Sequence, residues 1–401
     1  MSGNAAARAP VYLNALGLCC ALGPRAEAVA ARLFRDAPEP GVQPSTAFLG
    51  RRLMVGEVPG GLPTLDEYPL PLRGRNNALL RLALDDLGAA LPAALEGVAP
   101  ERVAIVLGSS TSGIGETERA FRQRDLHGGL PADFHYAMQE MGTPARFVAH
   151  AIGLPRAAQS VISTACSSGA KALATAARLV QGGRADVVIA GGADSLCGFT
   201  LAGFSALEAV SEERCNPFSA NRRGINIGEG AALFLVSRRP GLVRLCGWGE
   251  SADAHHMSAP DPAGRGARLA IEAALHGAGL DGKAIDYVNL HGTATAQNDA
   301  MEAPVSAALY GAQVPMSSTK PLTGHALGAA GAIEAGLCWL MLARNPEGWL
   351  LPQLWDGHPD PALPPLRFVA PGERATRPLR HVASHSFAFG GSNAALVLGA
   401  A

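Results

Sequence analysis

Apolar runs of two lengths alternate along the chain. The shorter runs are rich in Val, Ile and Leu and predict buried β-strands at residues 102–108, 186–192, 231–237, 285–292 and 394–400. The longer runs are rich in Ala and Leu and predict helices at residues 77–96, 170–183, 266–280 and 331–344. Strands that alternate with helices in this way are typical of an α/β protein.

The apolar stretch at residues 11–23 has two interpretations. Arg8 precedes it, so the stretch has the outline of a secretory signal peptide with a cationic start and an apolar core. However, Arg8 is the only cation there, and no clean A-x-A cleavage site follows. We therefore expect a buried first strand that ends in a turn at residues 22–27.

A weak internal repeat divides the chain. Two pairs of segments share the same predicted elements: 76–113 with 267–295, and 160–180 with 317–342. In the first pair a helix leads into a strand, and in the second a turn of small residues leads into a helix. We expect two similar halves, residues 1–240 and residues 241–401, that pack sheet against helix against sheet and hold a site between them.

Composition narrows the classes of function. The 401 residues carry a net charge of -1, so no bulk electrostatic field draws the chain to nucleic acid or to an anionic membrane. No apolar run of about 18 residues lacks glycine breaks, and we expect no membrane helix. Seven cysteines, an odd number without a CxxC pair, indicate free thiols in a reducing compartment, and we expect a cytoplasmic protein.

Lysine is rare in this chain. Of the 33 Lys and Arg residues, the lysines are Lys171, Lys283 and Lys320. Because arginine serves almost everywhere a generic cation would do, each lysine is a candidate for a role that needs a compact point charge.

Cys166 stands at a corner between a predicted strand and a predicted helix, in the sequence "VISTACSSGA". Its small neighbours let the backbone turn sharply and let a substrate approach. A helix that begins near this residue would favour a thiolate, which is a strong nucleophile for acyl groups. The alternative is a thiol that only fills space, which is our interpretation of the other six cysteines.

Two of the eleven histidines, His291 and His325, lie in glycine-flanked turns, "NLHGTAT" and "PLTGHALG". Together with Cys166 they form a candidate Cys-His-His set. A zinc site is the alternative, because cysteine and histidine are zinc ligands. Ligands spread over about 160 residues with no close pair are unlike a structural zinc site, so we expect no metal.

The chain resembles the β-ketoacyl-(acyl-carrier-protein) synthases of the thiolase-like condensing enzymes. The motifs that carry the resemblance run from "LGLCCALG" through "TACSSG", "AGGADS", "NPFSANRRGINIGEGAA", "HGTAT" and "STKPLTGHALGAAGAIE" to "SFAFGGSNA". With His325 at the third catalytic position, the chain is most similar to the elongating Cys-His-His class. Enzymes that start fatty-acid chains pair the cysteine with His and Asn, and degradative thiolases use a second cysteine. The resemblance implies a five-layer αβαβα fold with two pseudo-symmetric halves.

The resemblance also implies an acyltransferase reaction. Cys166 would take an acyl group from an acyl carrier protein, and His291 and His325 would stabilise the enolate formed when malonyl-carrier protein loses CO2. The enolate carbon would then attack the acyl-cysteine and lengthen the chain by two carbons. Backbone N–H groups of Cys166 and Phe389 would form the oxyanion hole, with Gly390 in a mobile gate next to Phe389.

Further residues have expected roles through the same resemblance. Thr293, Thr295 and Phe387 would line the substrate site, and Lys320 would set the local charge with Glu302 as its partner. The acidic carrier protein would dock on arginines, for which the candidates are Arg73, Arg75, Arg81, Arg214, Arg222 and Arg223. No cofactor is expected, because the phosphopantetheine arm arrives on the carrier protein.

The stretch at residues 216–232 departs from the common family pattern. That pattern has Asp at the positions of Ser219 and Arg223, and Phe-Val at the positions of Ile225 and Asn226. The departure favours a specialised secondary pathway, such as that of the aryl-polyene pigments, over ordinary fatty-acid synthesis. We expect a homodimer, or a heterodimer with a related ketosynthase or chain-length-factor subunit. The alternatives are a non-catalytic chain-length-factor-like subunit, a Cys-His acyl hydrolase and a thiolase.

Overall fold

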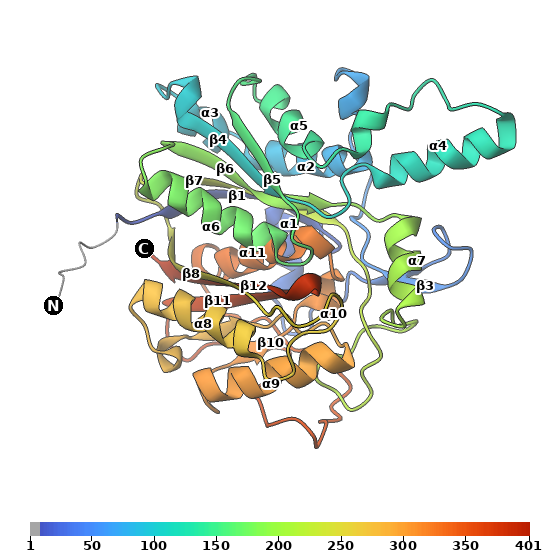
Figure 1. The fold of residues 1–401 in the computed structure, drawn as a ribbon. Helices are drawn as coiled ribbons and strands as arrows, with labels where there is room; N and C mark the ends of the chain where they lie inside the picture. The colour runs from blue at the N-terminus through green and yellow to red at the C-terminus, as the bar shows by residue number, and fades with distance from the viewer. Residues whose placement is uncertain (1–8) are drawn as a thin grey trace.

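Ten strands form one continuous sheet in the computed structural model, which describes residues 9–401 (Figure 1). The strand order is β10-β9-β11-β12-β8-β1-β7-β6-β4-β5, and β2 and β3 form a separate pair. The strands are β1 (Tyr12–Cys20), β2 (Gln43–Ser45), β3 (Leu53–Val55), β4 (Val103–Gly108), β5 (Ala158–Ile162), β6 (Val187–Asp194), β7 (Gly230–Ser237), β8 (Val243–Ala252), β9 (Tyr287–Asn289), β10 (Met316–Ser317), β11 (His381–Ala388) and β12 (Ser392–Ala400).

The two halves of the sheet have the same topology. In the order β5-β4-β6-β7-β1, the first three strands are mutually parallel, and β7 and β1 are each antiparallel to the strand before them. The order β10-β9-β11-β12-β8 repeats this pattern. The halves join where Tyr12 of β1 pairs with Arg244 of β8. The pseudo-symmetric arrangement is therefore confirmed, whereas the domain boundary between residues 240 and 241 stays a prediction.

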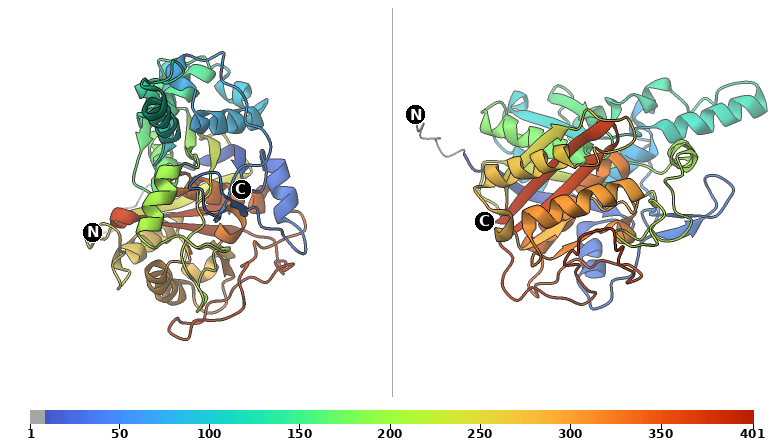
Figure 2. Two further views of the ribbon diagram at one scale, coloured as in Figure 1. Left: turned by 90° about the vertical axis from the view of Figure 1, so that its right-hand side faces the viewer. Right: turned by 60° about the horizontal axis from the view of Figure 1, so that its bottom comes forward.

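Helices cover both faces of each half-sheet. They are α1 (Ala26–Leu33), α2 (Arg75–Leu87), α3 (Ala90–Leu95), α4 (Ile114–His127), α5 (Thr143–Ala151), α6 (Ser168–Gln181), α7 (Gly198–Ala206), α8 (Arg265–Ala278), α9 (Ala296–Tyr310), α10 (Lys320–Thr323) and α11 (Ala330–Ala343). These elements make the five expected layers, from top to bottom in Figure 1. The order is α2 with α5, the first half-sheet, α6 with α11, the second half-sheet, and α8 with α9. Figure 2 shows α8 and α9 in front of strands β11 and β12.

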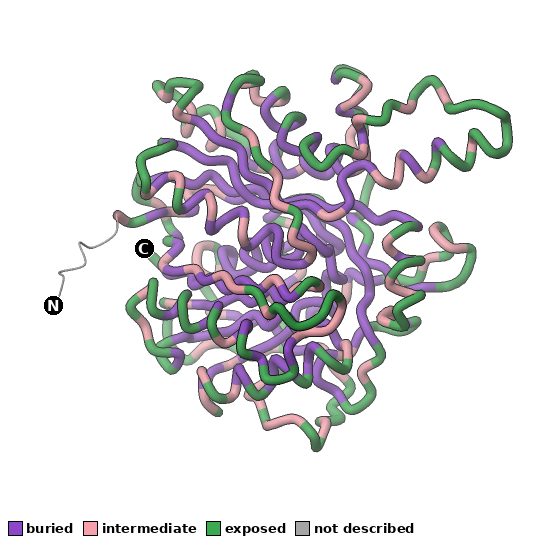
Figure 3. The backbone as a smooth tube through the Cα atoms, viewed as in Figure 1, coloured by how far each residue is buried: buried purple, intermediate pink, exposed green. Residues whose placement is uncertain are grey.

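The middle layer holds the most deeply buried helix. Every residue of α11 from Ala330 to Met341 is buried, as the purple centre of Figure 3 shows. A helix that is apolar all round has no face to offer to water, so both half-sheets can pack against it. Helix α6 approaches closely because Gly169 has no side chain; a Cβ there would lie 2.7 Å from the backbone nitrogen of Ala332.

Two expected elements differ in the structure, and one long helix was not expected. The helix predicted at residues 77–96 breaks at Gly88, whose φ of +50° ends α2 before the short α3 begins. The strand predicted at 285–292 shortens to β9, because the backbone N–H groups of His291 and Gly292 bond to a carboxylate instead of a neighbouring strand. Helix α4, which extends away from the body in Figure 1, was not predicted.

The interpretation of residues 11–23 as a strand is confirmed. Strand β1 pairs with β7 along almost its whole length in the middle of the sheet, and the signal-peptide interpretation is therefore wrong. Arg8, which suggested that alternative, lies outside the described residues. Among the helices of residues 9–401, none is both long enough and apolar enough to cross a membrane.

The outer helices pack directly on glycines in the strands, which gives a test of the fold. At Gly249 of β8, a Cβ would lie 1.9 Å from the carbonyl oxygen of Ala270 in α8. Gly249→Ala should lower the free energy of unfolding by about 1–3 kcal/mol, because α8 must move off the sheet. Chemical denaturation measures this change. Gly61→Ala is the matched control, since no atom lies within 4 Å of its Cβ position. Equal stabilities for the two variants would contradict this packing.

Candidate active site

The turn between β5 and α6 presents Cys166. Ala165, directly before it, has a φ of +50°, a strained conformation for a residue with a side chain. The turn is fixed by Ser168, whose Oγ accepts the N–H of Thr164 at 2.8 Å. Helix α6 begins at Ser168, two residues after the expected start near Cys166. The thiol is 5% exposed and lies at the positive end of this helix.

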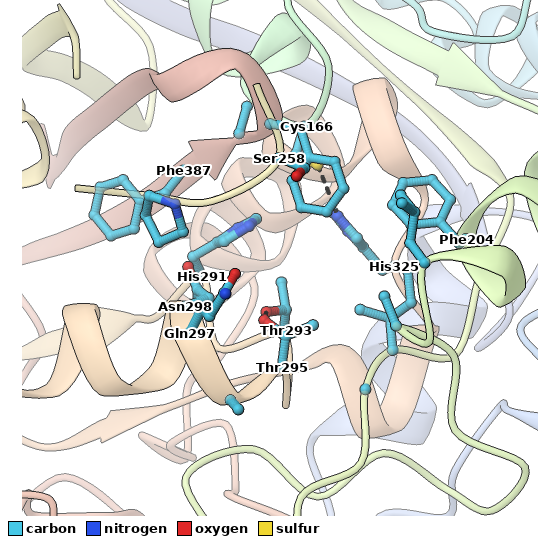
Figure 4. A pocket seen from close by; sticks show the side chains of 18 of the residues that line it. Cys166, Phe204, Ser258, His291, Thr293, Thr295, Gln297, Asn298, His325 and Phe387 are labelled. Atoms are coloured by element: carbon cyan, nitrogen blue, oxygen red, sulfur yellow. Dashed lines mark hydrogen bonds between the residues drawn. The ribbon is translucent and has the colours of Figure 1, made fainter. Parts of the chain in front are cut away.

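A second turn, between α10 and α11, presents His325. Gly324 adopts a φ of +71° there and packs against the backbone of Gly228, so the turn needs a residue without a side chain. The N–H of His325 donates to the carbonyl oxygen of Asn226 at 2.7 Å. Its Nε2 lies 3.0 Å from Sγ of Cys166, the contact drawn as a dashed line in Figure 4.

His291 completes the group from the loop after β9. Its ring meets the ring of His325 edge-on, with 5.4 Å between centroids. One ligand atom from each of Cys166, His291 and His325 lies within 4.8 Å of the others. The structure therefore brings together the three side chains that the sequence singled out over about 160 residues of chain.

The pairing expected for Lys320 is corrected by the structure. Nζ of Lys320 lies 2.5 Å from Oε1 of Glu334 in α11, and it also donates to the carbonyl oxygen of His291. Glu302 instead accepts the N–H of His291 and the N–H of Gly292, each at 2.7 Å. His291 is thus held on its N–H by a carboxylate and on its carbonyl by an ammonium group.

Burial sets the charge states of the reacting groups. Burial raises the pKa of Cys166 to about 12, although the Lys320 charge and the N–H of Phe389 pull it down. Burial also lowers the pKa values of His291 and His325 well below their usual range, and Lys320 adds to that effect. At neutral pH the site therefore holds a thiol beside two uncharged imidazoles.

The three side chains could in principle bind a metal ion, since the set offers one sulfur and two nitrogen ligands. Tetrahedral zinc, with bonds of about 2.3 Å to sulfur and about 2.0 Å to nitrogen, would hold two such atoms about 3.5 Å apart. Sγ of Cys166 and Nε2 of His325 are 3.0 Å apart, the separation of a hydrogen bond. The geometry favours a nucleophile and its base over a pair of metal ligands.

A cavity of about 430 Å³ opens in front of these groups. Thr293 and Thr295 lie on one wall, with their hydroxyl oxygens 2.9 Å apart, as expected for residues that line a substrate site. Phe387 lies edge-on to His291, and Phe204 packs against Phe389 with 5.5 Å between centroids. Figure 4 shows the labelled side chains around the space. The lining combines the aromatic rings of Phe204, Phe387 and Phe389 with polar side chains that make up about half of its residues.

The backbone at Phe389 faces the thiol. Its N–H helps to offset the effect of burial on the pKa of the Cys166 thiol. Gly390 follows with a φ of +79°, and its N–H donates to the carbonyl oxygen of Met257 at 2.8 Å. This arrangement places an N–H donor where an oxyanion on an acyl-cysteine would need one.

The candidate docking arginines separate into two groups. Arg75 bonds to the buried carboxylate of Glu229, and Arg222 pairs with Asp360 at 2.5 Å, so both serve internal contacts. Arg73 and Arg223 are exposed, and Arg223 lies at the edge of the cavity. Arg81 pairs with Asp85, whereas Arg214 is exposed. The docking prediction therefore rests on Arg73, Arg214 and Arg223.

Two buried acids were missed by the sequence analysis. Asp194, at the end of β6, accepts the backbone N–H groups of Thr111 at 2.8 Å and Gly328 at 2.6 Å, which ties the first half to the turn that carries His325. Glu334 is the partner of Lys320. A lone acid inside the apolar sequence "AGAIEAGLCWLMLA" was a readable signal, because a buried charge needs a partner.

The Lys320–Glu334 pair gives a test of this geometry. Lys320→Met should lower the free energy of unfolding by about 3–5 kcal/mol, because it leaves the carboxylate of Glu334 buried without its cation. The double variant Lys320→Met/Glu334→Leu should recover most of that loss, since both charges are then gone. Chemical denaturation of the four proteins in this cycle measures the coupling. Recovery with Glu302→Leu in place of Glu334→Leu would show that the pairing assigned here is wrong.

Known proteins share this arrangement. Residues 79–240 match the family described as beta-ketoacyl synthase, N-terminal domain, and residues 242–352 match the beta-ketoacyl synthase C-terminal domain. Nodulation protein E of Rhizobium meliloti (strain 1021) is 34% identical over 308 residues, which cover 74% of this chain and 75% of that protein. The 3-oxoacyl-[acyl-carrier-protein] synthase 2 of the same organism is 37% identical over 256 residues, which is 59% of each chain.

Solved structures extend the similarity over nearly the whole chain. A ketosynthase (ApeO) in complex with its chain length factor (ApeC) from Xenorhabdus doucetiae superposes with a TM-score of 0.91 at 39% identity, covering 98% of both chains. The ishigamide ketosynthase/chain length factor superposes with a TM-score of 0.84 at 26% identity, covering 98% of this chain and 100% of that chain. The chain therefore belongs to the β-ketoacyl synthase family of acyl-transferring condensing enzymes.

Proposed function

We propose that this protein condenses an acyl group held on Cys166 with a malonyl group presented by an acyl carrier protein. The product is a β-ketoacyl chain longer by two carbons, and CO2 is released. The observation that carries the proposal is the 3.0 Å contact between Cys166 and His325, with His291 beside it, at one end of a cavity of about 430 Å³. That cavity offers room for an acyl chain next to the nucleophile.

Acyl transfer comes first. Sγ of Cys166 attacks the thioester carbonyl of the acyl carrier protein, and Nε2 of the uncharged His325 accepts the thiol proton. The N–H of Phe389 stabilises the tetrahedral oxyanion, a contact of a kind that contributes about 3 kcal/mol. The thiolate of the carrier arm leaves and takes the proton from His325. Cys166 then holds the chain as a thioester.

Decarboxylation and condensation follow. The N–H groups of His291 and His325 donate to the thioester carbonyl of malonyl-carrier protein and stabilise the enolate as CO2 departs. The enolate carbon attacks the acyl carbonyl on Cys166, and the thiolate of Cys166 leaves and takes up a proton from solvent. No described group bonds to Nδ1 of either histidine. Each uncharged ring can therefore carry its proton on Nδ1 when Nε2 must accept a proton, and on Nε2 when Nε2 must donate.

The supporting residues have distinct tasks. Lys320 holds the carbonyl of His291 and adds to the effect of burial that keeps both imidazoles uncharged, while Glu334 balances its charge. Thr293 and Thr295 bind the malonyl group, and Phe387 and Phe389 shape the acyl channel. The phosphopantetheine arm of the carrier protein supplies the thioester, so the reaction needs no further cofactor.

A secondary pathway of the aryl-polyene type is the proposed setting. Support comes from the departures at Ser219 and Arg223 and from the similarity to a ketosynthase that is in complex with its chain length factor. The protein would work in the cytoplasm as a homodimer or beside a related subunit. A non-catalytic chain-length-factor-like role is less supported because Cys166, both histidines and Lys320 are all present and together. A hydrolase or a thiolase is less supported because the family matches are to ketosynthases.

Mass spectrometry of carrier-bound products tests the proposal. The protein is mixed with acyl-carrier protein and malonyl-carrier protein, with and without a chain length factor, and Cys166→Ala is the control. We expect a β-ketoacyl product two carbons longer with the native protein and none with Cys166→Ala. A failure of Cys166 to acquire an acyl group under either condition would overturn the proposal.

The pH dependence of malonyl decarboxylation gives a second test. Because the pKa values of His291 and His325 lie well below 6.5, both rings stay uncharged as the pH falls from 8 to 6, and they become charged only below that range. The rate of malonyl decarboxylation by Cys166→Ala should therefore be flat over this range. A fall in rate with a midpoint near pH 6.5 would contradict the assigned charge states.

A further inference from the structure

A second histidine network lies behind the active site. His385 of β11 has 0% exposure, and Tyr310 and Glu302 of α9 are 1% and 0% exposed. The hydroxyl of Tyr310 lies 2.8 Å from Nε2 of His385, and Nδ1 of His385 lies 3.3 Å from Oε1 of Glu302. Tyr310 also stacks on the His385 ring, with 5.6 Å between centroids. None of the three lines the cavity, so the mechanism above has no direct use for them.

The chemistry of Glu302 determines which atoms donate and which accept in this network. As a carboxylate, Glu302 only accepts hydrogen bonds, and its other contacts are the backbone N–H groups of His291 and Gly292 and the amide of Asn298. Nδ1 of His385 must therefore carry a proton to bond to Glu302. Glu302 thus fixes a proton on Nδ1 of His385, and the Tyr310 hydroxyl bonds to Nε2 on the other side of the ring. Tyr310 holds the His385 ring in place, and His385 helps to fix Glu302.

Glu302 connects this network to the loop that carries His291. Its two oxygens hold the N–H groups of His291 and Gly292 at 2.7 Å each, and Lys320 holds the carbonyl of His291 from the other side. A second route runs through Phe387, whose ring lies 5.5 Å from His385 and 5.9 Å from His291 between centroids. His385 therefore supports the position of the His291 imidazole through both a polar and an apolar contact.

We propose that His385 and Tyr310 are positioning residues for His291, and therefore for the decarboxylating half of the reaction. This inference rests on the proposed function. The acyl-transfer half depends on other supports, because Cys166 is held by the turn before α6 and His325 by the carbonyl of Asn226. Loss of the network should therefore affect the two halves of the reaction unequally.

The experiment compares two partial reactions in each variant. Acyl transfer is the acylation of Cys166 by acyl-carrier protein, followed by intact-protein mass spectrometry. Decarboxylation is the release of CO2 from malonyl-carrier protein. The variants are His385→Leu, which removes the donor to Glu302, His385→Asn, whose amide retains a donor, and Tyr310→Phe, which removes the contact to Nε2 of His385.

The control is Tyr287→Phe. Tyr287 is also fully buried, and its hydroxyl lies 2.6 Å from Oγ of Ser317, outside the network. This variant loses one buried hydroxyl group, as Tyr310→Phe does, and so reports the general cost of that loss. Thermal unfolding of every variant shows whether the protein is folded.

We expect His385→Leu to slow decarboxylation about 10–100-fold, with acyl transfer within about twofold of the native rate, because a misplaced catalytic group costs rate without unfolding the protein. His385→Asn should restore most of the rate, and Tyr310→Phe should slow decarboxylation more than Tyr287→Phe does. Unchanged decarboxylation in His385→Leu, or an equal loss of both partial reactions, would overturn the inference. If the native protein performs neither reaction, the proposed function itself is wrong, and the inference falls with it.

Discussion

The helix layer shared by the two half-sheets is the constraint on which the site depends. Helices α6 and α11 pack against each other and against strands of both halves, so their starting turns lie at the same end of the molecule. Cys166 comes just before one helix and His325 just before the other, and the pseudo-symmetry of the halves makes these places equivalent. The 3.0 Å contact between the two side chains follows from the packing of the layer. A shift of either helix would separate the nucleophile from its base.

One buried cation organises the electrostatics of this end of the layer. Burial has the largest effect on the pKa values of Cys166, His291 and His325, and the charge of Lys320 acts on all three: it adds to the lowering at both histidines and opposes the rise at Cys166. A charge acts strongly here because little water screens it, and the same absence of water makes Glu334 necessary as its partner. A compact ammonium group can contact Glu334 and the His291 carbonyl together, which explains why lysine stands here in a chain that uses arginine almost everywhere else.

Much of the fold and the core of the site could be predicted because they depend on local patterns. Apolar run length separated strands from helices, and glycine-flanked turns pointed to His291 and His325. The pairing of Lys320 could not be predicted, because the choice between Glu302 and Glu334 depends on how α9 and α11 pack around the loop. The separation of the docking arginines into those paired with acids and those that are exposed is likewise a property of the packed chain. The role of His385 could not be predicted from the sequence, because its partners Tyr310 and Glu302 lie 75 and 83 residues away along the chain.

The position of strand β12 affects how the protein folds during its synthesis on the ribosome. Residues 392–400 lie between β8 and β11 in the sheet, so the second half-sheet has a gap until that segment has been synthesised. Until then the apolar surfaces of α6 and α11 that pack against β12 have no cover. Contacts between segments so distant in sequence form slowly, because a long loop must close first. Between the synthesis of α11 and that of β12, the nascent chain therefore carries an incompletely covered apolar helix layer, and general chaperones bind surfaces of that kind.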